Sequence, residues 1–378
     1  MFIDSLHLNN FRNFSSLKIL FDKNLTVILG PNGSGKSNIL EACGLLATVR
    51  SSRVETDLDL VKFGKSETKI EGFFGKNFTP GVESGSHPEN TLGVSLERAK
   101  LTINFQVVDE TYVKKAYFVD EIKRRYIDFS EHFSIIIFEP LDLDLVSGSP
   151  SLRRHHLDSL LSSIDRDYWR AFGAYNKVVV RRNKVLWRIQ EGHSEPNELD
   201  FWDARLLEHG KIVSAKRQEF FEFLNLPAGR QVLFESLSWE FKQSLVSEEK
   251  LAKNRDRDIA AGVTLSGPHR DDFIFQIRNS LLRSKTSQSE IRNLEYFGSR
   301  GEQRMAVLAL KLAELEFVAT KKMARPVLAL DDIFSELDLE HREAVLEVIG
   351  KQQVIITAAE KDSLPKKIFM RAKVVELR

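Results

Sequence analysis

Residues 25–49 read LTVILGPNGSGKSNILEACGLLATV, and this stretch decides the fold class. Its central octet, Gly30 to Ser37, matches the pattern G-x-x-x-x-G-K-S/T at every fixed position. An apolar, strand-like run precedes the octet, and a helical pattern follows it. A glycine-rich loop between a strand and a helix suits phosphate, because the loop N–H groups and the helix N-terminus surround the anion. We therefore expect an α/β P-loop fold.

The residue types in this loop indicate separate roles. Lys36 would reach the β- and γ-phosphates of a nucleotide, and the Ser37 hydroxyl would hold Mg²⁺. The glycines would let backbone N–H groups face the phosphates without a Cβ in the way. A glycine-rich turn with an incidental lysine is the alternative, and the flanking strand and helix disfavour it. The expected nucleotide-binding residues are Gly30, Pro31, Asn32, Gly33, Ser34, Gly35, Lys36, Ser37 and Asn38.

An acidic strand end should complete the site. The run PVLALDD ends in Asp331 and Asp332 after an apolar strand over residues 327–330. The carboxyl end of a buried parallel strand is also where a P-loop lies, so the two elements should meet. Asp331 would then orient the Mg²⁺ shell, and Asp332 would accept a proton from the attacking water. An acidic strand end at a solvent edge is the alternative, which the P-loop disfavours.

A second helix start also suits phosphate. Residues 297–317 read FGSRGEQRMAVLALKLAELEF, with Ser299 and Gly301 where a helical pattern begins, but no P-loop lysine. Phosphoryl transfer needs charge stabilisation from more than one side, and another molecule can supply the second side. Ser299 and Gly301 would then face the γ-phosphate in a partner's P-loop, whose lysine makes another one unnecessary. The alternative is an ordinary amphipathic helix with a glycine-containing cap.

Composition limits the class of protein. The 378 residues predict two or three domains. Cys43, the one cysteine, excludes an intrachain disulfide and fits a reducing cytoplasm. No run of about 18 apolar residues is present, so we expect no membrane-spanning helix. The net charge is +1, so any nucleic-acid contact should come from a local basic surface.

The order of patterns along the chain predicts two lobes. Strand-like runs open and close the chain, and helical patterns fill its middle, beginning with a Ser149–Pro150 helix start. Residues 79–93 should form an exposed loop, and residues 340–349 a late helix. We expect a discontinuous α/β lobe and an inserted, mostly helical lobe. Their expected ranges are residues 1–146 with 262–378, and residues 147–261.

A basic ridge is expected on one helix of the inserted lobe. At 100° per residue, five basic side chains between residues 168 and 189 fall within about 40° of one direction, opposite an apolar side. Such a ridge can neutralise DNA phosphates without reading bases, although an ordinary solvated helix face is the alternative. Arg182 projects to the apolar side and should pair with a buried carboxylate. The candidate DNA-binding residues are Arg170, Lys177, Arg181, Lys184 and Arg188.

Two further basic motifs lie outside the ridge helix. Arg153 and Arg154 would either extend the ridge or pin the interface between the lobes. The motif SGPHRDD, over residues 266–272, reads as a charged turn into a strand, with Arg270 paired to one of the two following aspartates.

Together these motifs resemble the bacterial RecF family of recombination and repair ATPases, which is related to SMC-type and ABC-type heads. The resemblance covers nearly the whole chain. The P-loop is shared by very many ATPases, whereas SPSLRRHHLD and SGPHRDD are far more specific to this family. The stretches that carry the resemblance are NNFRNF, GPNGSGKSNILEA, FEPLDLDLVSGSPSLRRHHLD, YNKVVVRRNKVL, WDARLLEHG, TLSGPHRDDF, SRGEQRMAVLALKLAELE and LALDDIFSELD.

The resemblance implies an ABC-type lobe I, interrupted by a helical lobe II, and it assigns further site residues. Arg12 matches an arginine that approaches the phosphates in related heads. Thr357 stands where ABC transporter ATPases place a histidine, which suggests slow turnover. The signature motif, acting in trans, would contain Ser299, Gly301, Glu302 and Gln303. The D-loop at the dimer interface would contain Ser335 and Asp338.

The resemblance also implies ligands and partners. ATP and Mg²⁺ would bind, and ATP would drive a homodimer that acts as a slow, DNA-stimulated ATPase switch. DNA partners would be duplexes and single-strand/double-strand junctions, and RecO and RecR would act with the protein to load RecA. The alternative functions are the ATP-binding subunit of an ABC-type transporter and an SMC-like structural ATPase. The latter needs a long coiled coil, for which this chain is too short.

Overall fold

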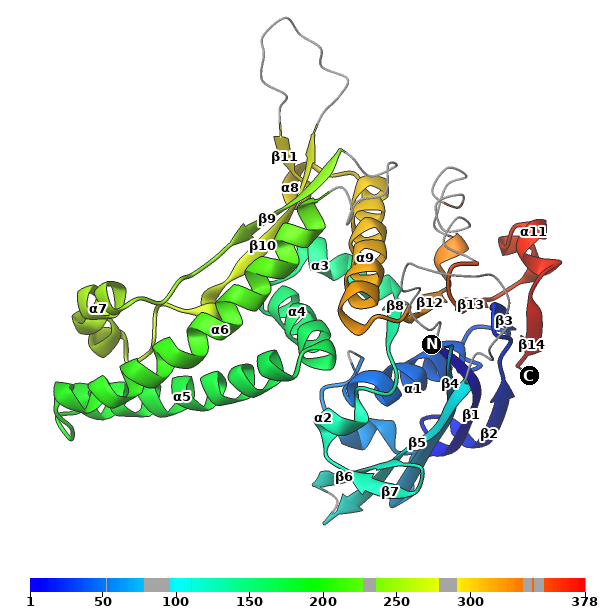
Figure 1. The fold of residues 1–378 in the computed structure, drawn as a ribbon, viewed down its shortest axis with the longest axis horizontal. Helices are drawn as coiled ribbons and strands as arrows, with labels where there is room; N and C mark the ends of the chain where they lie inside the picture. Colours follow the sequence, from blue (N-terminus) through cyan, green and yellow to red (C-terminus); the bar gives the residue numbers. More distant parts are fainter. Residues whose placement is uncertain are drawn as a thin grey trace, which may run out of the picture. The chain divides into compact units, whose positions relative to one another are not determined.

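The computed structural model describes residues 1–51, 53–77, 96–109, 111–226, 236–278, 291–335, 342 and 350–377. Contacts divide the chain into two compact units (Figure 1). The first combines Met1–Pro140 with Val318–Arg378, and the second is Leu141–Phe317. The first unit is therefore built from both ends of the chain. The loop expected over 79–93 and most of the helix expected over 340–349 lie outside the described residues.

A five-stranded sheet in the first unit contains β3 (Leu25–Leu29), β8 (Ile135–Phe138), β12 (Val327–Asp331), β13 (Val354–Ala358) and β14 (Lys373–Glu376). The strand order is β14-β3-β13-β12-β8, and every neighbouring pair is parallel. β3, β12 and β13 are buried at every residue, which is typical of a parallel sheet covered on both faces. Since the strands are parallel, the carboxyl ends of β3, β12 and β8 lie at one edge of the sheet.

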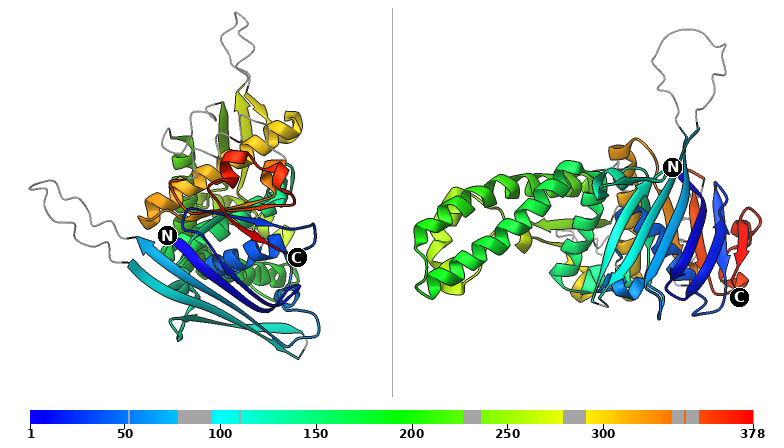
Figure 2. Two further views of the ribbon diagram at one scale, coloured as in Figure 1. Left: turned by 90° about the vertical axis from the view of Figure 1, so that its right-hand side faces the viewer. Right: turned by 90° about the horizontal axis from the view of Figure 1, so that it is seen from below.

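An antiparallel sheet forms a second layer of this unit (Figure 2). Its strand order is β2-β1-β4-β5-β6-β7. Apolar side chains alternate along these strands, so that one face is buried and the other is polar. The strand-like runs that open the chain are thus confirmed as strands. The strands are β1 (Phe2–Phe11), β2 (Phe14–Leu20), β4 (Glu67–Asn77), β5 (Leu96–Val108), β6 (Tyr112–Val119) and β7 (Ile122–Arg124).

Helix α1 (Lys36–Thr48) packs between the two sheets and joins them into one core. Ile39, Leu40 and Leu45 are fully buried there, and each contributes about 1.5–3 kcal/mol of hydrophobic stabilisation. Cys43 is buried in the same core, and burial raises the pKa of its thiol to about 12. The P-loop therefore rests on a helix that is rigidly held by both sheets.

A buried glutamine also joins the two sheets. The Gln353 side chain accepts a hydrogen bond from the Ile3 N–H (2.7 Å) and donates to the Ile3 carbonyl (2.8 Å). It also donates to the Asp22 carbonyl at 2.7 Å, just before β3. One amide group thus ties the first strand of the antiparallel sheet to the parallel sheet. The short helices of this unit are η1 (Asp57–Leu60), α2 (Tyr126–Phe129), η7 (Ile333–Ser335), η8 (Lys361–Ser363) and α11 (Lys366–Phe369).

The second unit is dominated by two long helices, α5 (Arg166–Gln190) and α6 (Leu199–Asn225), which lie side by side (Figure 1). Helix α4 (Pro150–Ile164) begins where expected, with Ser149 as its N-cap residue and Pro150 in its first turn. The Asp165 carboxylate caps α5 by accepting from the Asp167 and Tyr168 N–H groups. The other helices are η2 (Pro140–Leu143), α3 (Asp144–Ser147), η3 (Pro196–Glu198), α7 (Glu248–Ala261), η6 (Pro268–Arg270), α8 (Leu294–Phe297) and α9 (Arg300–Lys322), which crosses the unit boundary.

The boundary expected at residue 262 is wrong. Strand β10 (Asp272–Arg278) pairs on one side with β9 (Leu237–Lys242) and on the other with β11 (Ile291–Asn293). This antiparallel sheet belongs to the second unit, where Phe273 of β10 packs on Phe221 of α6. Alternation along a strand shows that it has one buried face, but not which sheet it joins. The inserted unit therefore runs to Phe317 and contains a small sheet.

Candidate nucleotide-binding site

The P-loop connects the end of β3 to the start of α1. Its Lys36 side chain is buried and donates hydrogen bonds to the Gly30 carbonyl (2.6 Å) and the Pro31 carbonyl (3.0 Å). The lysine amine is thus folded back over its own loop. The ammonium group already lies inside the ring of backbone atoms that would surround a phosphate.

Two glycines of the loop adopt left-handed backbone conformations that disfavour other residues. Gly33 has φ 84°, and Gly35, the N-cap residue of α1, has φ 97°. A Cβ at residue 35 would also lie 2.4 Å from the Phe14 ring. No side chain caps α1, so its N-terminal end presents backbone N–H groups and the helix dipole to a ligand.

Asp331 brings together the ends of three elements. Its Oδ1 accepts hydrogen bonds from the Ser37 hydroxyl (3.0 Å) and from the Thr357 hydroxyl (2.7 Å). Ser37 comes from α1, Asp331 from β12 and Thr357 from β13. The acidic strand end therefore meets the P-loop, as expected, although we did not expect Thr357 to hold Asp331.

The same cluster fits Mg²⁺. A hydroxyl and a carboxylate are hard oxygen ligands, which Mg²⁺ prefers, and it usually takes one or two such protein ligands plus phosphate oxygens and water. Within the described residues, no group of three or more His, Cys, Asp or Glu side chains is placed to hold a metal ion. Ser37 and Asp331 would therefore hold the ion together with a bound nucleotide.

Asp332 follows directly, at the edge of the sheet. Its φ is 52°, a left-handed conformation that few non-glycine residues adopt. The Asp332 N–H donates to the Thr357 hydroxyl at 3.0 Å, which fixes this turn of the backbone. Thr357 thus holds the carboxylate of Asp331 and the backbone of Asp332.

Arg12 lies beside the P-loop helix, held by an acidic partner. Its guanidinium donates to both carboxylate oxygens of Glu41, at 2.8 and 2.7 Å, and to the Asp59 carbonyl at 3.2 Å. Glu41 is on α1, one turn after Ser37. The structure therefore places Arg12 against α1, one turn beyond Ser37, and Glu41 neutralises its charge.

Asn38, by contrast, braces the loop. Its side-chain amide donates to Oδ1 of Asn13 at 3.0 Å, and Nδ2 of Asn13 in turn donates to the Ser34 carbonyl at 3.3 Å. Residues after β1 therefore support the P-loop from the side.

Sequence reasoning missed one charged pair at this edge of the sheet. Glu139 follows β8, the strand next to β12, and its carboxylate lies 4.0 Å from Arg53 Nε. The Arg53 Nη1 atom is buried and makes no hydrogen bond within the described part of the chain. A lone arginine after a helix has no distinctive spacing, so only the fold could place it here.

The signature residues start α9 in the second unit. Ser299 Oγ accepts from the Glu302 N–H (3.2 Å), and the Glu302 carboxylate accepts from the Ser299 N–H (2.7 Å), which is a capping box. Gln303 is buried and donates to the Leu294 carbonyl at 3.0 Å. Glu302 and Gln303 therefore serve their own unit. Ser299 and Gly301 are exposed, and remain available to another molecule.

The D-loop residues cannot be placed on the site. Asp338 and the side chain of Ser335 lie outside the described part of the structure.

The basic ridge is exposed along α5, and its opposite side is packed. Tyr175, Val178, Val185 and Leu186 are buried on that opposite side. The expected orientation of the helix is therefore confirmed. The five exposed residues of the ridge are Arg170, Lys177, Arg181, Lys184 and Arg188.

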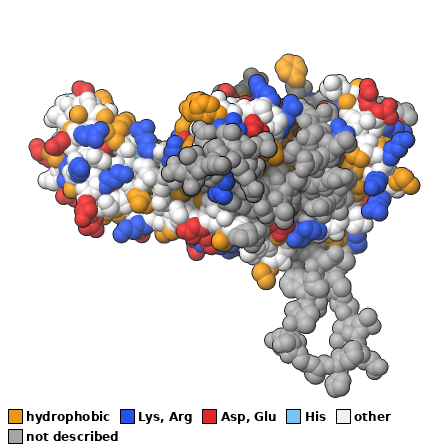
Figure 3. Space-filling model, turned by 90° about the horizontal axis from the view of Figure 1, so that it is seen from above, with side chains coloured by type: hydrophobic (Ala, Val, Ile, Leu, Met, Phe, Trp, Pro, Cys, Tyr) orange, Lys and Arg blue, Asp and Glu red, His pale blue; other side chains and the backbone are white. Residues whose placement is uncertain are grey.

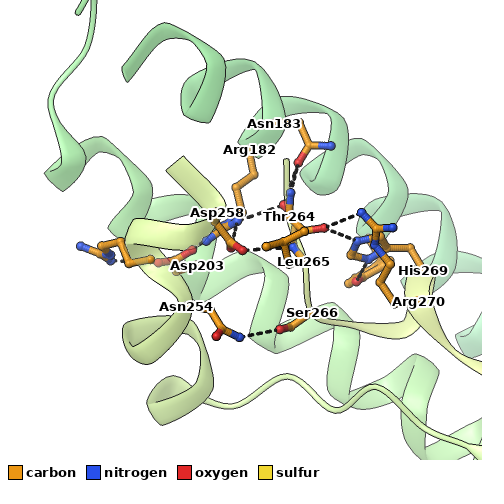
Figure 4. A network of polar contacts seen from close by, with 12 residues as sticks. Arg182, Asn183, Asp203, Asn254, Asp258, Thr264, Leu265, Ser266, His269 and Arg270 are labelled. Carbon is orange, nitrogen blue, oxygen red and sulfur yellow. Dashed lines mark hydrogen bonds and ion pairs between the residues drawn. The ribbon is translucent and has the colours of Figure 1, made fainter. Parts of the chain in front are cut away.

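Arg182 points inward, as expected (Figure 4). Its guanidinium is fully buried and pairs with Asp203 of α6 (2.6 Å) and Asp258 of α7 (2.7 Å). It also donates to the Thr264 hydroxyl at 3.0 Å. The prediction of a buried carboxylate partner is thus confirmed, with two partners rather than one.

Arg153 and the SGPHRDD motif form a second buried network within the second unit. Arg153 donates to the Asp272 carboxylate at 2.7 Å and thereby ties α4 to β10, so it does not extend the ridge. Asp271 pairs with Arg217 of α6 at 2.8 Å, and burial raises the pKa of its carboxyl. Arg270 instead donates to the Thr264 carbonyl at 3.4 Å, so its expected pairing with Asp271 or Asp272 is wrong. Both aspartates are already occupied by arginines from distant helices.

Comparisons with known proteins agree with this architecture. The model of the RecF/RecN/SMC N-terminal domain family matches residues 2–375. The DNA replication and repair protein RecF of Moorella thermoacetica is 34% identical, over 99% of this chain and 94% of that protein. The protein of the same name from Agathobacter rectalis is 32% identical, over 99% of this chain and 96% of its own length.

A solved structure of the recombination mediator protein RecF with ATP, in the RecFOR pathway, is also similar. It is 28% identical, with a TM-score of 0.79 over 96% of this chain and 93% of that chain. Among the described residues, no helix has the length and apolar character needed to cross a membrane.

Proposed function

This chain belongs to the RecF family, within the RecF/RecN/SMC N-terminal domain group, and from that membership we propose that it is an ATP-dependent DNA-binding ATPase of replication and repair. The observation that supports the proposal most is the Ser37–Asp331–Thr357 cluster beside the folded-back Lys36. It combines a phosphate-binding loop with two oxygen ligands, from Ser37 and Asp331, at one edge of the sheet. Phosphoryl transfer requires both of these features.

The residues of the site would divide the work of hydrolysis. Lys36 would leave the Gly30 and Pro31 carbonyls and donate to the β- and γ-phosphates, while the open end of α1 receives the negative charge. Mg²⁺, held by Ser37 and Asp331, would neutralise charge that develops on the phosphate oxygens. Asp332, fixed by Thr357, would accept the proton of the attacking water.

The signature helix would complete the site from a second copy. Gly301 supports this arrangement, because its own chain gives no reason for a glycine there. Among the described residues, an added Cβ would meet only Ser299 Oγ, at 4.0 Å, and glycine within a helix is about 1 kcal/mol less favourable than alanine. Close approach of a ligand to the backbone is the usual reason for such a glycine. ATP would therefore close a homodimer, and hydrolysis would open it.

DNA would bind along the ridge on α5. Five exposed basic side chains on one face can contact phosphates without reading bases, which suits a protein that recognises DNA structure rather than sequence. We infer single-strand/double-strand junctions as the preferred DNA, and RecO and RecR as partners in loading RecA. The similar solved structure, described as part of a RecFOR pathway, supports these partners.

The full-length match to RecF relatives favours this function over an ABC-type transporter subunit. An SMC-like structural role is disfavoured because it needs a long coiled coil, whereas the longest described helix, α6, has 27 residues. A cytoplasmic location follows as part of the same proposal.

Replacing Lys36 with arginine tests the nucleotide site. The planar guanidinium cannot occupy the place of the compact amine between two carbonyls, so hydrolysis should fall by about 10²–10³-fold or more. ATP-driven dimerisation, followed by sedimentation with and without ATP, should weaken as well. Lys65→Arg, at an exposed position of the same unit, is the matched control. Unchanged hydrolysis and dimerisation in Lys36→Arg would refute the assignment.

Charge reversal tests the ridge. The double variant Arg181→Glu/Lys184→Glu should lower DNA affinity and reduce the salt slope of log K by about 0.9 for each lost phosphate contact. Lys253→Glu/Arg257→Glu makes the same charge change at exposed positions on α7 and should leave the slope unaltered. If both doubles behave alike, binding reflects overall charge and the ridge has no special role.

A further inference from the structure

Two stretches that are far apart in the sequence, residues 149–158 and 266–272, meet within the second unit. The later stretch is a tight turn, in which Gly267 has φ 129°, a conformation that favours glycine. A Cβ at this position would also collide with the Tyr175 hydroxyl group of α5. The turn is therefore packed closely against α5 and has little conformational freedom.

His269 fixes the same turn by two hydrogen bonds. Its Nε2 lies 2.9 Å from the Thr264 carbonyl oxygen, which can only accept, so Nε2 carries a proton. Burial lowers the pKa of His269, which keeps the ring neutral at pH 7, so Nδ1 accepts from the Tyr175 hydroxyl at 2.7 Å. Arg270, the next residue, points toward the same Thr264 carbonyl (Figure 4). Arg270 is thus carried on a fixed backbone.

Each aspartate of the two stretches has an arginine partner. Asp272 accepts both bonds of a fork from Arg153, at 2.7 and 3.0 Å. Arg217 of α6 pairs with Asp158 at 2.6 Å and with Asp271 at 2.8 Å. The buried part of this contact therefore contains matched charges, as buried ion pairs require.

Two further arginines here bond only to main-chain carbonyls. Arg154 Nη1 donates to the Asp271 carbonyl at 2.8 Å, and Arg270 Nη2 donates to the Thr264 carbonyl at 3.4 Å. Among the described residues, neither forms an ion pair with a carboxylate. Arg154 is half-buried and Arg270 is exposed. We refer to this pair as the motif arginines.

The charge of the motif arginines is incompletely compensated. Burial and the neighbouring Arg217 lower the pKa of Arg154. Since arginine stays charged at neutral pH, this direction indicates a cation with too little negative charge around it. Charge density alone does not single out such a pair, because basic and acidic side chains are mixed on the face drawn in Figure 3. The hydrogen bonds identify it instead.

We propose that the motif arginines bind a phosphate group of the DNA backbone. The inference rests on the proposed function and adds a phosphate contact to the ridge on α5. The turn that carries Arg270 is bonded to Tyr175 of α5, so the packing of one unit fixes the spacing between the two contacts. A guanidinium fork fits phosphate oxygens, and the repeated phosphates of one strand can serve both this pair and the ridge.

Removal of both charges tests the site. Arg154→Gln/Arg270→Gln should lower DNA affinity by about 10- to 100-fold at about 0.1 M salt, and should reduce the salt slope of log K by about 0.9 for each lost contact. Lys253→Gln/Arg257→Gln removes two exposed charges from α7 and should leave the slope unaltered. Fluorescence anisotropy with a labelled duplex, over a range of salt concentrations, measures both quantities. Thermal melting checks that both doubles are folded.

A single variant covers the case in which loss of the half-buried Arg154 lowers stability. Arg270→Gln changes an exposed side chain with one long hydrogen bond, so the melting temperature should stay unchanged. Its salt slope should fall by about 0.9, which corresponds to one phosphate contact. A wild-type slope in this folded variant would overturn the inference.

The source of the phosphate is tested by competition. Inorganic phosphate, added at constant ionic strength, should displace DNA equally weakly from the wild-type protein and from the Arg154→Gln/Arg270→Gln double. Strong displacement from the wild type alone would assign the site to a free phosphate group and overturn the proposal for DNA.

The remaining outcomes separate this inference from the proposed function. If the wild-type protein binds DNA and the motif-arginine double behaves like its α7 control, the arginines serve another anion, such as a carboxylate of a partner protein, and the inference is wrong. If the wild-type protein does not bind DNA at all, the proposed function itself is defeated.

Discussion

Two helix starts in this chain look alike in sequence but are completed in different ways. Helix α1 begins at Gly35 in a left-handed conformation, and no side chain caps it. Helix α9 begins at Ser299, where Ser299 and Glu302 cap one another. The start of α1 leaves its backbone N–H groups open to a ligand. The start of α9 satisfies one of its N–H groups with the Ser299 hydroxyl, and it exposes Ser299 and Gly301. A glycine and serine before a helix therefore mark two different kinds of phosphate contact.

Gly35→Ala should produce the largest effect. It tests whether the start of α1 requires a glycine at its N-cap. The left-handed backbone disfavours alanine by about 1–2 kcal/mol, and displacement of the Phe14 ring adds about 1–3 kcal/mol. We expect lower thermal stability and loss of ATP binding, measured by thermal melting and calorimetry. Gly173→Ala, where a Cβ would meet no atom of the described residues within 4 Å, is the control and should be neutral or stabilising.

Asp331→Asn tests the proposed Mg²⁺ site beside the start of α1. Removing the carboxylate charge should lower hydrolysis by about 10²–10³-fold, while the neutral amide retains the shape of the side chain. Chelation of Mg²⁺ should weaken ATP binding in the wild-type protein but hardly change it in the variant, as measured by calorimetry. Equal sensitivity to chelation in both proteins would remove Asp331 from the metal site.

Gly301→Ala tests the second start and should have opposite effects on stability and activity. The unfolding free energy should rise by up to about 1 kcal/mol, since alanine favours the helix and the position is open. ATP-driven dimerisation should weaken because the new methyl group obstructs the approach of a partner's phosphate. Denaturant unfolding and sedimentation with ATP measure the two quantities. A variant that dimerises normally would leave the glycine unexplained.

Ser299→Ala should have a small effect on stability. Loss of the capping hydroxyl lowers the unfolding free energy by about 1 kcal/mol. Ser299→Asp preserves the cap but places a negative charge where a γ-phosphate would approach. If the serine acts only as a cap, Ser299→Asp should retain dimerisation. If it contacts phosphate, Ser299→Asp should dimerise less well than Ser299→Ala.

Much of the first unit could be predicted from sequence because its signals are local. The P-loop fits a fixed spacing between a strand and a helix, and the alternation in β4 to β6 identifies strands directly. The inward direction of Arg182 followed from helical periodicity alone. These features depend on neighbours within one or two turns of chain.

Features that depend on distant partners could not be predicted in this way. The pairing of β10 with β9 rather than with the first unit is set by tertiary packing. Thr357 holds Asp331 across 26 residues, and Arg53 reaches Glu139 from a segment with no distinctive pattern. Arg270 lost both expected partners to arginines from other helices, since bidentate or buried geometry outweighs proximity along the chain.

The Gln353 amide has a consequence for how this protein responds to ATP. By bonding Ile3 and Asp22 at once, it fastens the strand that leads to Arg12 to the strand that leads to the P-loop. Breaking three hydrogen bonds, two of them buried, is too costly for a routine motion. Within this unit, β1 and β3 therefore move as one rigid body. Adjustments to ATP are restricted to side chains and to the P-loop itself.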